Sequence, residues 1–296
     1  MPIEALRTPE EAFAELPGYP WAPNYIDDLP GYERLRLHYI DTGPGRSRRT
    51  WVCLHGQPSW SYLYRRMIPI FEASGHRVVA PDLFGFGRSD KPVEDALYTF
   101  EFHRNALLRF LERIEGPVTL VVQDWGGILG LTLPMENHRI DQIVVMNTAL
   151  AVGAHPGDAF LAWRDFVASK PDFSISGLMR RGTPHLTQAE AAAYDAPFPD
   201  SRFRAGARRF PALLPITPEM PGADIGQAAQ TFFQTHWQGK SFVAIGEADP
   251  VLGPPVMDKL ASLLGVDDPM RLPEGGHFLQ EWGEPIAKRA VAQMAD

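Results

Sequence analysis

Apolar residues are distributed along the chain in two alternating patterns. Short, almost continuously apolar runs are typical of strands covered on both faces, and they lie at residues 49–54, 77–80, 118–122, 142–146 and 241–245. An earlier strand is expected at residues 35–40. Segments with helical periodicity lie between these runs, at residues 62–71, 100–114, 127–135, 256–264 and 278–294. This alternation predicts an α/β fold with a mostly parallel sheet flanked by helices.

The alternation is interrupted at residues 153–221, which contain no strand pattern and are rich in Pro, Ala, Phe and Arg. Within this stretch Thr187 is followed by a helical segment with Glu190 three residues on, the spacing of a capping box. Pro218, Pro221 and Gly222 mark the end of the stretch. We therefore expect a core domain formed by residues 1–152 and 222–296, with a helical cap domain, residues 153–221, inserted into it.

Composition narrows the class of protein. With 296 residues, 45% hydrophobic and 22% charged, the chain can bury a large core. Its formal net charge of −8 offers no basic excess to neutralise phosphates, which argues against nucleic acid as a partner.

Location is suggested by what the chain does not contain. No apolar run approaches the roughly 18 residues of a membrane span, and the acidic N-terminus does not have the pattern of a signal peptide. The single cysteine, Cys53, lies in an apolar run and is expected to be a buried thiol, which favours a reducing compartment. The sequence thus predicts a soluble, cytoplasmic protein that binds no membrane.

The segment 118–127 carries the first candidate for chemistry. An apolar strand ends at Gln123. Asp124 and Trp125 follow it, and Gly126 and Gly127 open a helix. This strand–turn–helix sequence is typical of a nucleophile elbow, in which glycines allow a sharp turn. Asp124 stands where a serine is usual. A helix N-cap is the ordinary alternative for such an aspartate, and the other candidate residues decide against it.

A second loop, after the strand at residues 49–54, contains His55, Gly56 and Gln57. Loops in this place bring a backbone N–H towards the elbow and complete an oxyanion hole. The expected donors are the backbone N–H groups of Gln57 and Trp125. For His55 we expect a bracing role in the loop rather than catalysis. The Gly-rich loop at residues 79–89 has neither a lysine nor the spacing of a nucleotide-binding loop, so we expect it to be scaffold.

Two further candidates lie late in the chain. Asp249 follows the strand at residues 241–245, and His277 follows a Gly-Gly pair just before the last helix. The order nucleophile, acid, histidine is that of α/β-hydrolases. Glu247 is a competing carboxylate, but it lies inside the strand end, so Asp249 is the better placed acid.

Together these segments resemble the haloalkane dehalogenases of the α/β-hydrolase superfamily over nearly the whole chain. The blocks that carry the resemblance are HGQPSWSYLYRRM, DLFGFGRSDKP and VVQDWGG, with FLAWR, AYDAPFPD and RRFP in the insertion. The Asp124-Trp125 pair distinguishes this chain from the fluoroacetate dehalogenases, in which an arginine tends to follow the nucleophile. The insertion resembles the cap of the subgroup whose acid follows the later strand. In agreement, the strand at 142–146 ends in Asn147 and leaves Asp249 as the acid.

The resemblance implies a two-step hydrolysis of haloalkanes without a metal or another cofactor. A carboxylate is ionised at pH 7, so Asp124 would displace halide directly and form an alkyl ester. His277, oriented by Asp249, would then activate water. The partners implied are a small halogenated alkane, water and the halide product, with a monomer as the expected state.

The resemblance also implies roles for the cap. Indole N–H groups of Trp125 and Trp163 would bind the leaving halide, whereas core packing is the ordinary role of a tryptophan in a helical cap. Gln57 stands where the family more often has Glu or Asn, so no role of its side chain is carried over. Residues expected to line the pocket, with plain core packing as the alternative for each, are Phe160, Phe210, Pro211, Leu214 and Val251.

Two rival functions remain open from the sequence. An epoxide hydrolase uses a similar Asp–His–acid triad but usually needs cap tyrosines to protonate the epoxide, and the expected cap contains Tyr194 alone. A binding module that has lost catalysis would typically lack a triad member, whereas all three are present here. Haloalkane hydrolysis is therefore preferred.

Overall fold

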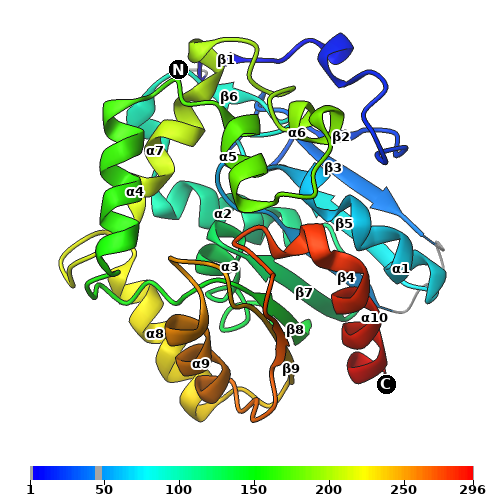
Figure 1. Cartoon of the computed structure of the whole chain (residues 1–296), viewed down its shortest axis with the longest axis vertical. Coiled ribbons are helices and arrows are strands. Elements are labelled where there is room, and N and C mark those ends of the chain that lie inside the picture. Colours follow the sequence, from blue (N-terminus) through cyan, green and yellow to red (C-terminus); the bar gives the residue numbers. More distant parts are fainter. Residues whose placement is uncertain (1–2, 44–48, 296) are drawn as a thin grey trace.

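The computed structural model describes residues 3–43 and 49–295, and its centre is an eight-stranded sheet (Figure 1). The strand order is β10-β9-β8-β7-β4-β5-β3-β2, parallel from β5 to β10 and antiparallel at β3 and β2. The strands are β2 (Asn24–Ile26), β3 (Leu37–Thr42), β4 (Thr50–Leu54), β5 (Arg77–Pro81), β7 (Val118–Gln123), β8 (Ile140–Met146), β9 (Lys240–Gly246) and β10 (Met270–Leu272). The fold class predicted from the sequence is thus confirmed.

The central strands are apolar because both of their faces are covered. Helices α1 (Ile68–Ala73) and α10 (Gly283–Met294) pack on one face, and α2, α3, α8 and α9 lie on the other (Figure 1). The bounds of the second group are Phe100–Glu112, Trp125–Gly130, Ala223–Thr235 and Pro254–Leu263. Every residue of β4 and β7 is buried, including Cys53, the thiol predicted to be internal.

Several predicted elements differ in their details. The helices expected at residues 62–71 and 278–294 each begin as 3₁₀ turns, Ser61–Arg66 and Leu279–Trp282, before α1 and α10. In the first case Pro69, which has no backbone N–H to donate, stands at the start of α1. The helix expected at 127–135 ends at Gly130, and the helix α8 and the strand β2 were not predicted.

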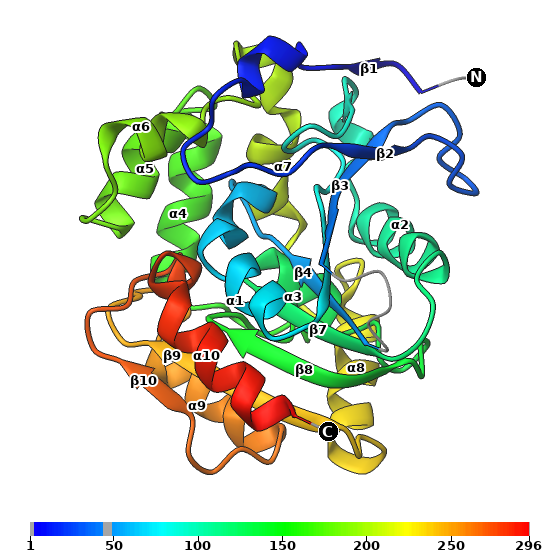
Figure 2. The same ribbon diagram turned by 90° about the vertical axis from the view of Figure 1, so that its right-hand side faces the viewer.

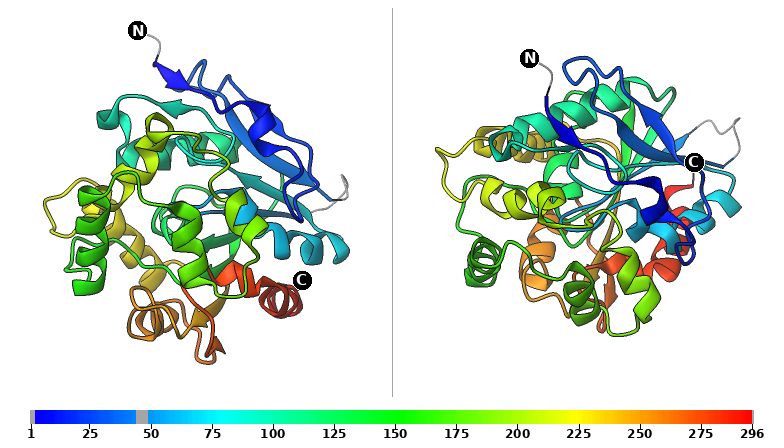
Figure 3. Two further views of the ribbon diagram at one scale, coloured as in Figure 1. Left: turned by 45° about the horizontal axis from the view of Figure 1, so that its top comes forward. Right: turned by 90° about the horizontal axis from the view of Figure 1, so that it is seen from above.

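The N-terminal segment runs over the outside of the domain before β2 joins the edge of the sheet (Figure 3). Its strand β1 (Ala5–Leu6) pairs in antiparallel fashion with β6 (Lys91–Pro92). In the described part of the chain, residues 3–43 and 49–295, no helix is both long and apolar enough to cross a membrane.

The segment between β8 and α8 is helical and lies to one side of the sheet, above the helices that follow it (Figure 2). Its helices are α4 (Asp158–Ser169), α5 (Ile175–Gly182), α6 (Gln188–Ala193) and α7 (Ala205–Leu213). Thr187 accepts a hydrogen bond from the Glu190 N–H, and the Glu190 side chain accepts one from Thr187, so the predicted capping box is formed. Gly222 adopts a left-handed conformation with φ 90° where α8 begins, at the predicted end of the insertion.

A buried charged network joins this helical segment to the sheet domain. Arg65, in the 3₁₀ turn before α1, forms a bidentate pair with Glu281 at 2.6 and 2.8 Å. Tyr194, at the end of α6, donates a hydrogen bond to the same carboxylate, and Glu190 lies 3.2 Å from Arg65. All four side chains are mostly buried, so their charges and hydrogen bonds must be matched within the network.

Candidate active site

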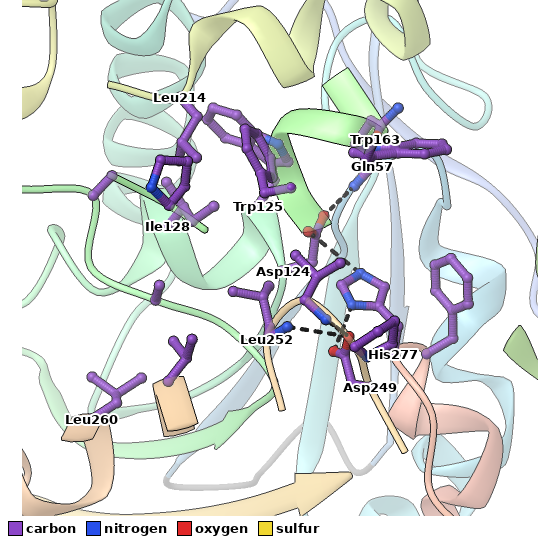
Figure 4. Close-up of a pocket in the computed structure, with 18 of the residues that line it drawn as sticks. Gln57, Asp124, Trp125, Ile128, Trp163, Leu214, Asp249, Leu252, Leu260 and His277 are labelled. Atoms are coloured by element: carbon purple, nitrogen blue, oxygen red, sulfur yellow. Dashed lines mark hydrogen bonds and ion pairs between the residues drawn. The ribbon is translucent and has the colours of Figure 1, made fainter. Parts of the chain in front are cut away.

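Asp124 lies at the turn between β7 and α3, in the conformation expected of a nucleophile elbow. Its φ of 49° and ψ of −128° are unusual for a residue with a side chain. The backbone on both sides holds this conformation: the Asp124 N–H donates to Asn147 O at 3.0 Å, and Asp124 O accepts from Gly127 and Ile128, each at 2.9 Å. The strained turn directs the carboxylate away from the sheet and into the cleft (Figure 4).

Close packing around this turn explains the glycines seen in the sequence. A Cβ atom at Gly126 would lie 2.0 Å from Leu54 O, and one at Gly127 would lie 2.3 Å from Thr148 Oγ1. A Cβ at Gly56 would collide with the Asp124 carboxylate itself, at 2.1 Å from Oδ1. Glycine at these positions lets the elbow lie against β4, the loop that follows β4 and Thr148 after β8.

The loop after β4 supplies a donor to the Asp124 carboxylate. The backbone N–H of Gln57 donates to Asp124 Oδ1 at 2.7 Å, as expected for an oxyanion-hole donor. Trp125 is the first residue of α3, so its backbone N–H has no acceptor within the helix. The Gln57 side chain donates instead to Ala207 O in α7, at 2.8 Å, and so links this loop to the inserted helices.

His55 is buried below this loop and braces it, as the sequence suggested. Its Nε2 accepts a hydrogen bond from the Leu83 N–H at 2.9 Å, and its Nδ1 lies 2.9 Å from Gly56 O. These contacts fix the tautomer with the proton on Nδ1. Burial lowers the pKa of His55, so the ring is neutral and structural.

His277 joins the two carboxylates predicted from the sequence. Its Nδ1 lies 2.8 Å from Asp249 Oδ2, and its Nε2 lies 3.5 Å from Asp124 Oδ2 (Figure 4). Asp249 is buried and is held by the Val251 and Leu252 N–H groups at 2.9 and 3.1 Å. The imidazole therefore bridges Asp124 and Asp249.

The charges in this row of side chains depend on one another. Burial would raise the pKa of Asp249, but the charge and hydrogen bond of His277, with the donors from Asn147 and Val251, lower it to about 2. Burial would lower the pKa of His277, but the charge of Asp249 and the hydrogen bond and charge of Asp124 raise it to about 10. With both carboxylates ionised, the imidazole therefore carries a proton on each nitrogen.

The triad opens into a cavity of about 780 Å³ between the sheet domain and the inserted helices. Most of its wall is apolar, which suits an uncharged organic substrate. Of the expected lining residues, Phe160, Leu214 and Val251 face this cavity. Trp125 and Trp163 also line it and bring two indole rings to its wall.

Two of the expected lining residues do not contribute to the cavity wall. Phe210 is fully buried behind Trp125, with ring centroids 4.9 Å apart, and it also packs edge-on against Phe86. Pro211 is buried within α7. Both residues lie on the inner side of that helix, where the sequence pattern alone does not distinguish a core face from a cavity face. Phe210 acts on the site through the Trp125 ring.

Sequence reasoning also missed three polar residues next to the triad. Asn147 donates to Asp249 Oδ2 at 2.9 Å and to Gly246 O at 3.1 Å, so it supports the acid from the neighbouring strand. Thr148 donates to Asp124 O at 2.7 Å. Gln123 contacts His277. Their common signal is a polar residue at the end of an apolar strand.

Among residues 3–43 and 49–295 no group of three or more His, Cys, Asp or Glu side chains is placed to hold a metal ion.

Fold and site together define an α/β-hydrolase with an aspartate at the nucleophile position. The family model described as alpha/beta hydrolase fold matches residues 51–284. The chain is 42% identical to a haloalkane dehalogenase of Psychrobacter cryohalolentis, over 99% of both chains. It is 41% identical to a haloalkane dehalogenase of Mycobacterium marinum, over 98% of this chain and 99% of that one.

A solved structure gives the same assignment. The tetrameric haloalkane dehalogenase DpaA from Paraglaciecola agarilytica superposes with a TM-score of 0.97 at 46% identity, over 99% of each chain. The chain therefore belongs to the haloalkane dehalogenases, hydrolases that act on carbon–halogen bonds. The resemblance and the function expected from the sequence are thereby confirmed.

Proposed function

We propose that this protein hydrolyses small haloalkanes to an alcohol and halide through a covalent ester on Asp124. The observation that carries the proposal is the Asp124 carboxylate, held between the Gln57 N–H at 2.7 Å and His277 Nε2 at 3.5 Å, at the wall of an apolar cavity. A serine in this place would need a base to become a nucleophile, whereas an ionised carboxylate needs none.

In the first step an Asp124 oxygen attacks the carbon that bears the halogen. The new C–O bond forms as the carbon–halogen bond breaks, and the halide leaves with the bonding electrons. The indole N–H groups of Trp125 and Trp163 stabilise the charge that develops on the halogen. Phe160, Leu214 and Val251 surround the alkyl part and keep bulk water from the reacting atoms.

In the second step water attacks the ester carbonyl carbon. His277 Nε2 takes a proton from that water, and Asp249 stabilises the imidazolium that forms. The backbone N–H groups of Gln57 and Trp125 bind the oxyanion of the tetrahedral intermediate, which then collapses to the alcohol and free Asp124. Across the cycle one haloalkane and one water yield one alcohol, one halide and one proton.

Two substitutions separate these steps. Asp124→Ala removes the nucleophile and is expected to abolish halide release from 1,2-dibromoethane and 1-bromobutane while the protein stays folded. His277→Phe leaves the first step intact and blocks the second, so intact-protein mass spectrometry should show one added alkyl group on the peptide that contains Asp124. Repeated turnover by His277→Phe, or halide release by Asp124→Ala, would refute the assignment.

The epoxide hydrolase alternative loses support from the position of Tyr194. Its hydroxyl is buried and donates to Glu281, and the residue does not line the cavity. It therefore offers no acid to an epoxide oxygen in the cleft. Styrene oxide in the same assay tests this point directly, and diol formation would restore the alternative.

The domain division, the assembly and the location are further parts of the proposal. Residues 153–221 would form the cap over a core of residues 1–152 and 222–296, and the protein would act in the cytoplasm.

Val93 is the one exposed large hydrophobic residue in the described part of the chain, which supports a monomer. Light scattering coupled to size exclusion tests this, and a mass near four times 33.0 kDa would instead match the tetramer described for DpaA.

A further inference from the structure

Gln123 occupies the last position of β7, directly before Asp124, and its side chain is fully buried. The side-chain amide turns towards His277 rather than towards the cavity. Its Nε2 donates to the backbone carbonyl of His277 at 2.9 Å and lies 3.3 Å from the ring nitrogen Nε2 of the same residue. One amide group thus touches both the backbone and the reactive edge of the histidine.

The orientation of this amide is fixed by its partners. A backbone carbonyl can only accept, so the NH₂ end of Gln123 must face His277 O. The opposite end, Oε1, accepts from Gln280 Nε2 at 3.4 Å, and Gln280 is itself fully buried at the turn before α10. The two glutamines form a buried link between the elbow strand and the segment that carries His277.

The segment that carries His277 needs such a link. Residues 273–278 form neither helix nor strand, and isolated backbone hydrogen bonds hold them: Gly275 O accepts from the Ala248 N–H at 2.9 Å, and His277 O accepts from the Leu279 N–H at 3.0 Å. The bond to Asp249 fixes only Nδ1, and the ring can still tilt about that contact. The Gln123 amide fixes the backbone of the residue and blocks movement of Nε2 away from Asp124 on that side.

We infer that Gln123 is a positioning residue for ester hydrolysis, holding His277 where its Nε2 can take a proton from the attacking water. The inference rests on the proposed function, because it assigns Gln123 to the second of the two steps. Halide displacement uses the Asp124 carboxylate and needs no contact from His277. Hydrolysis needs water, the imidazole and the ester carbon in line, and small displacements of such groups are costly.

Substitution of Gln123 should therefore slow ester hydrolysis and leave halide displacement almost unchanged. Gln123→Met keeps the length of the side chain and removes the amide. Loss of one hydrogen bond corresponds to about a three- to tenfold decrease in the rate of ester hydrolysis. The single-turnover rate of halide release should stay within about twofold of the wild-type rate. Rapid-quench mass spectrometry of 1-bromobutane turnover should then show more alkyl-enzyme at steady state.

Two further variants sharpen the test. Gln123→Glu is nearly isosteric and gives a second variant if methionine is not tolerated, and it places an anionic oxygen against the His277 carbonyl. The rate of hydrolysis should fall further. The pH at which hydrolysis becomes fast should also rise, because in the ester intermediate a second carboxylate, beside that of Asp249, then stabilises the imidazolium. Gln280→Met removes only the partner that orients the amide, so it should slow hydrolysis less than Gln123→Met.

Gln227→Met is the matched control, because Gln227 also donates a side-chain hydrogen bond to a backbone carbonyl, that of Val152, at an exposed position of α8. It should change neither step. Equal loss of both rates in Gln123→Met, or unchanged hydrolysis in a folded Gln123→Glu, would overturn the inference. If wild-type protein forms no alkyl-enzyme at all, the proposed function fails instead, so the two failures are distinguishable.

Discussion

At the residue scale, one imidazole lies between two carboxylates, and this position supplies the base that the proposed reaction needs in its second step. While Asp124 and Asp249 are both ionised, His277 holds its proton, with a pKa of about 10. In the proposed mechanism, esterification of Asp124 removes one of the two negative charges next to the ring, at the Nε2 edge. The pKa of His277 must then fall, so the histidine becomes a base at the step that needs one.

This coupling can be measured with a neutral residue at position 124. Asp124→Asn imitates the uncharged ester, and we expect the pKa of His277 to fall well below the wild-type value of about 10. The sign follows from charge: removing an anion near an imidazolium favours its neutral form. NMR titration of histidine-labelled protein measures the shift, and His277→Phe identifies the resonance among the nine histidines. An unchanged pKa would show that Asp124 does not control the ring.

Trp163 allows a second prediction at this scale. Trp163→Phe keeps most of the ring, and it preserves packing against Phe166 and Phe173, but it removes the N–H. A lost hydrogen bond to a developing halide corresponds to about a tenfold to hundredfold slower displacement step. Stopped-flow single turnover with 1-bromobutane and 1-chlorobutane measures it, with the chloride affected at least as much. Unchanged displacement and unchanged bromide affinity would leave Trp163 a packing residue.

At the element scale, the elbow depends on close packing between β4, β7 and α3, which leaves no space for an added side chain. The Cα of Gly126 lies so close to β4 that a methyl group would lie 2.0 Å from Leu54 O, an atom of the backbone. Leu54 is paired with Val122 in the β4–β7 ladder, so β4 cannot move away from Gly126 without breaking that ladder. The conformation of Asp124 is therefore a consequence of packing between elements.

Gly126→Ala tests this dependence. We expect a loss of stability of about 1–3 kcal/mol or more from overpacking, together with loss of halide release, because the turn must open. Urea denaturation measures the stability. Gly177→Ala in α5 is the comparison, since the nearest atom there is a side-chain oxygen, Ser174 Oγ, at 3.0 Å. Wild-type stability and activity in Gly126→Ala would show that the close approach is not essential.

At the scale of the whole molecule, the buried network of Arg65, Glu281, Tyr194 and Glu190 holds the inserted helices to the sheet domain. The Glu281 carboxylate is fully buried and receives both Arg65 and Tyr194. Such networks contribute less to stability than their number of contacts suggests, because desolvation offsets the attraction. Removing Arg65 is more costly, because the fully buried Glu281 then keeps only the partly exposed Arg66, whose Nε lies 2.9 Å from Glu281 Oε2, as its cation.

Arg65→Met should therefore destabilise the protein by about 3–5 kcal/mol, whereas Tyr194→Phe should cost about 1 kcal/mol. Chemical denaturation followed by tryptophan fluorescence measures both. A double variant, Arg65→Met with Glu281→Leu, should recover part of the loss because no charge is left unpaired. If Arg65→Met alone were as stable as wild type, the network would not be what holds the helices in place.

The strands β3, β4, β5, β7, β8 and β9 and most of the helices between them were predictable from the sequence, whereas the domain boundaries stay a prediction. The reason is that buried strands and amphipathic helices leave a local pattern of apolar residues. The capping box at Thr187 was predictable for the same reason, since its partners lie three residues apart. The 3₁₀ starts before α1 and α10 and the helix α8 were not, because tertiary packing overrides weak local preferences.

The triad Asp124, Asp249 and His277 could be chosen from the sequence because strand ends of a parallel sheet meet at one edge, so motifs at those ends converge. The sequence by itself thus determined the class of fold and the order along the chain of the residues that we propose for catalysis. Only the tertiary structure decided which residues face the cavity: Leu214 faces it, but Phe210, four residues earlier, packs behind Trp125. It also decided which polar side chains support the triad. Gln123 contacts His277, Asn147 contacts Asp249, and Gln280 contacts Gln123. These contacts join residues that are remote in the sequence, so they leave no periodic pattern in the chain.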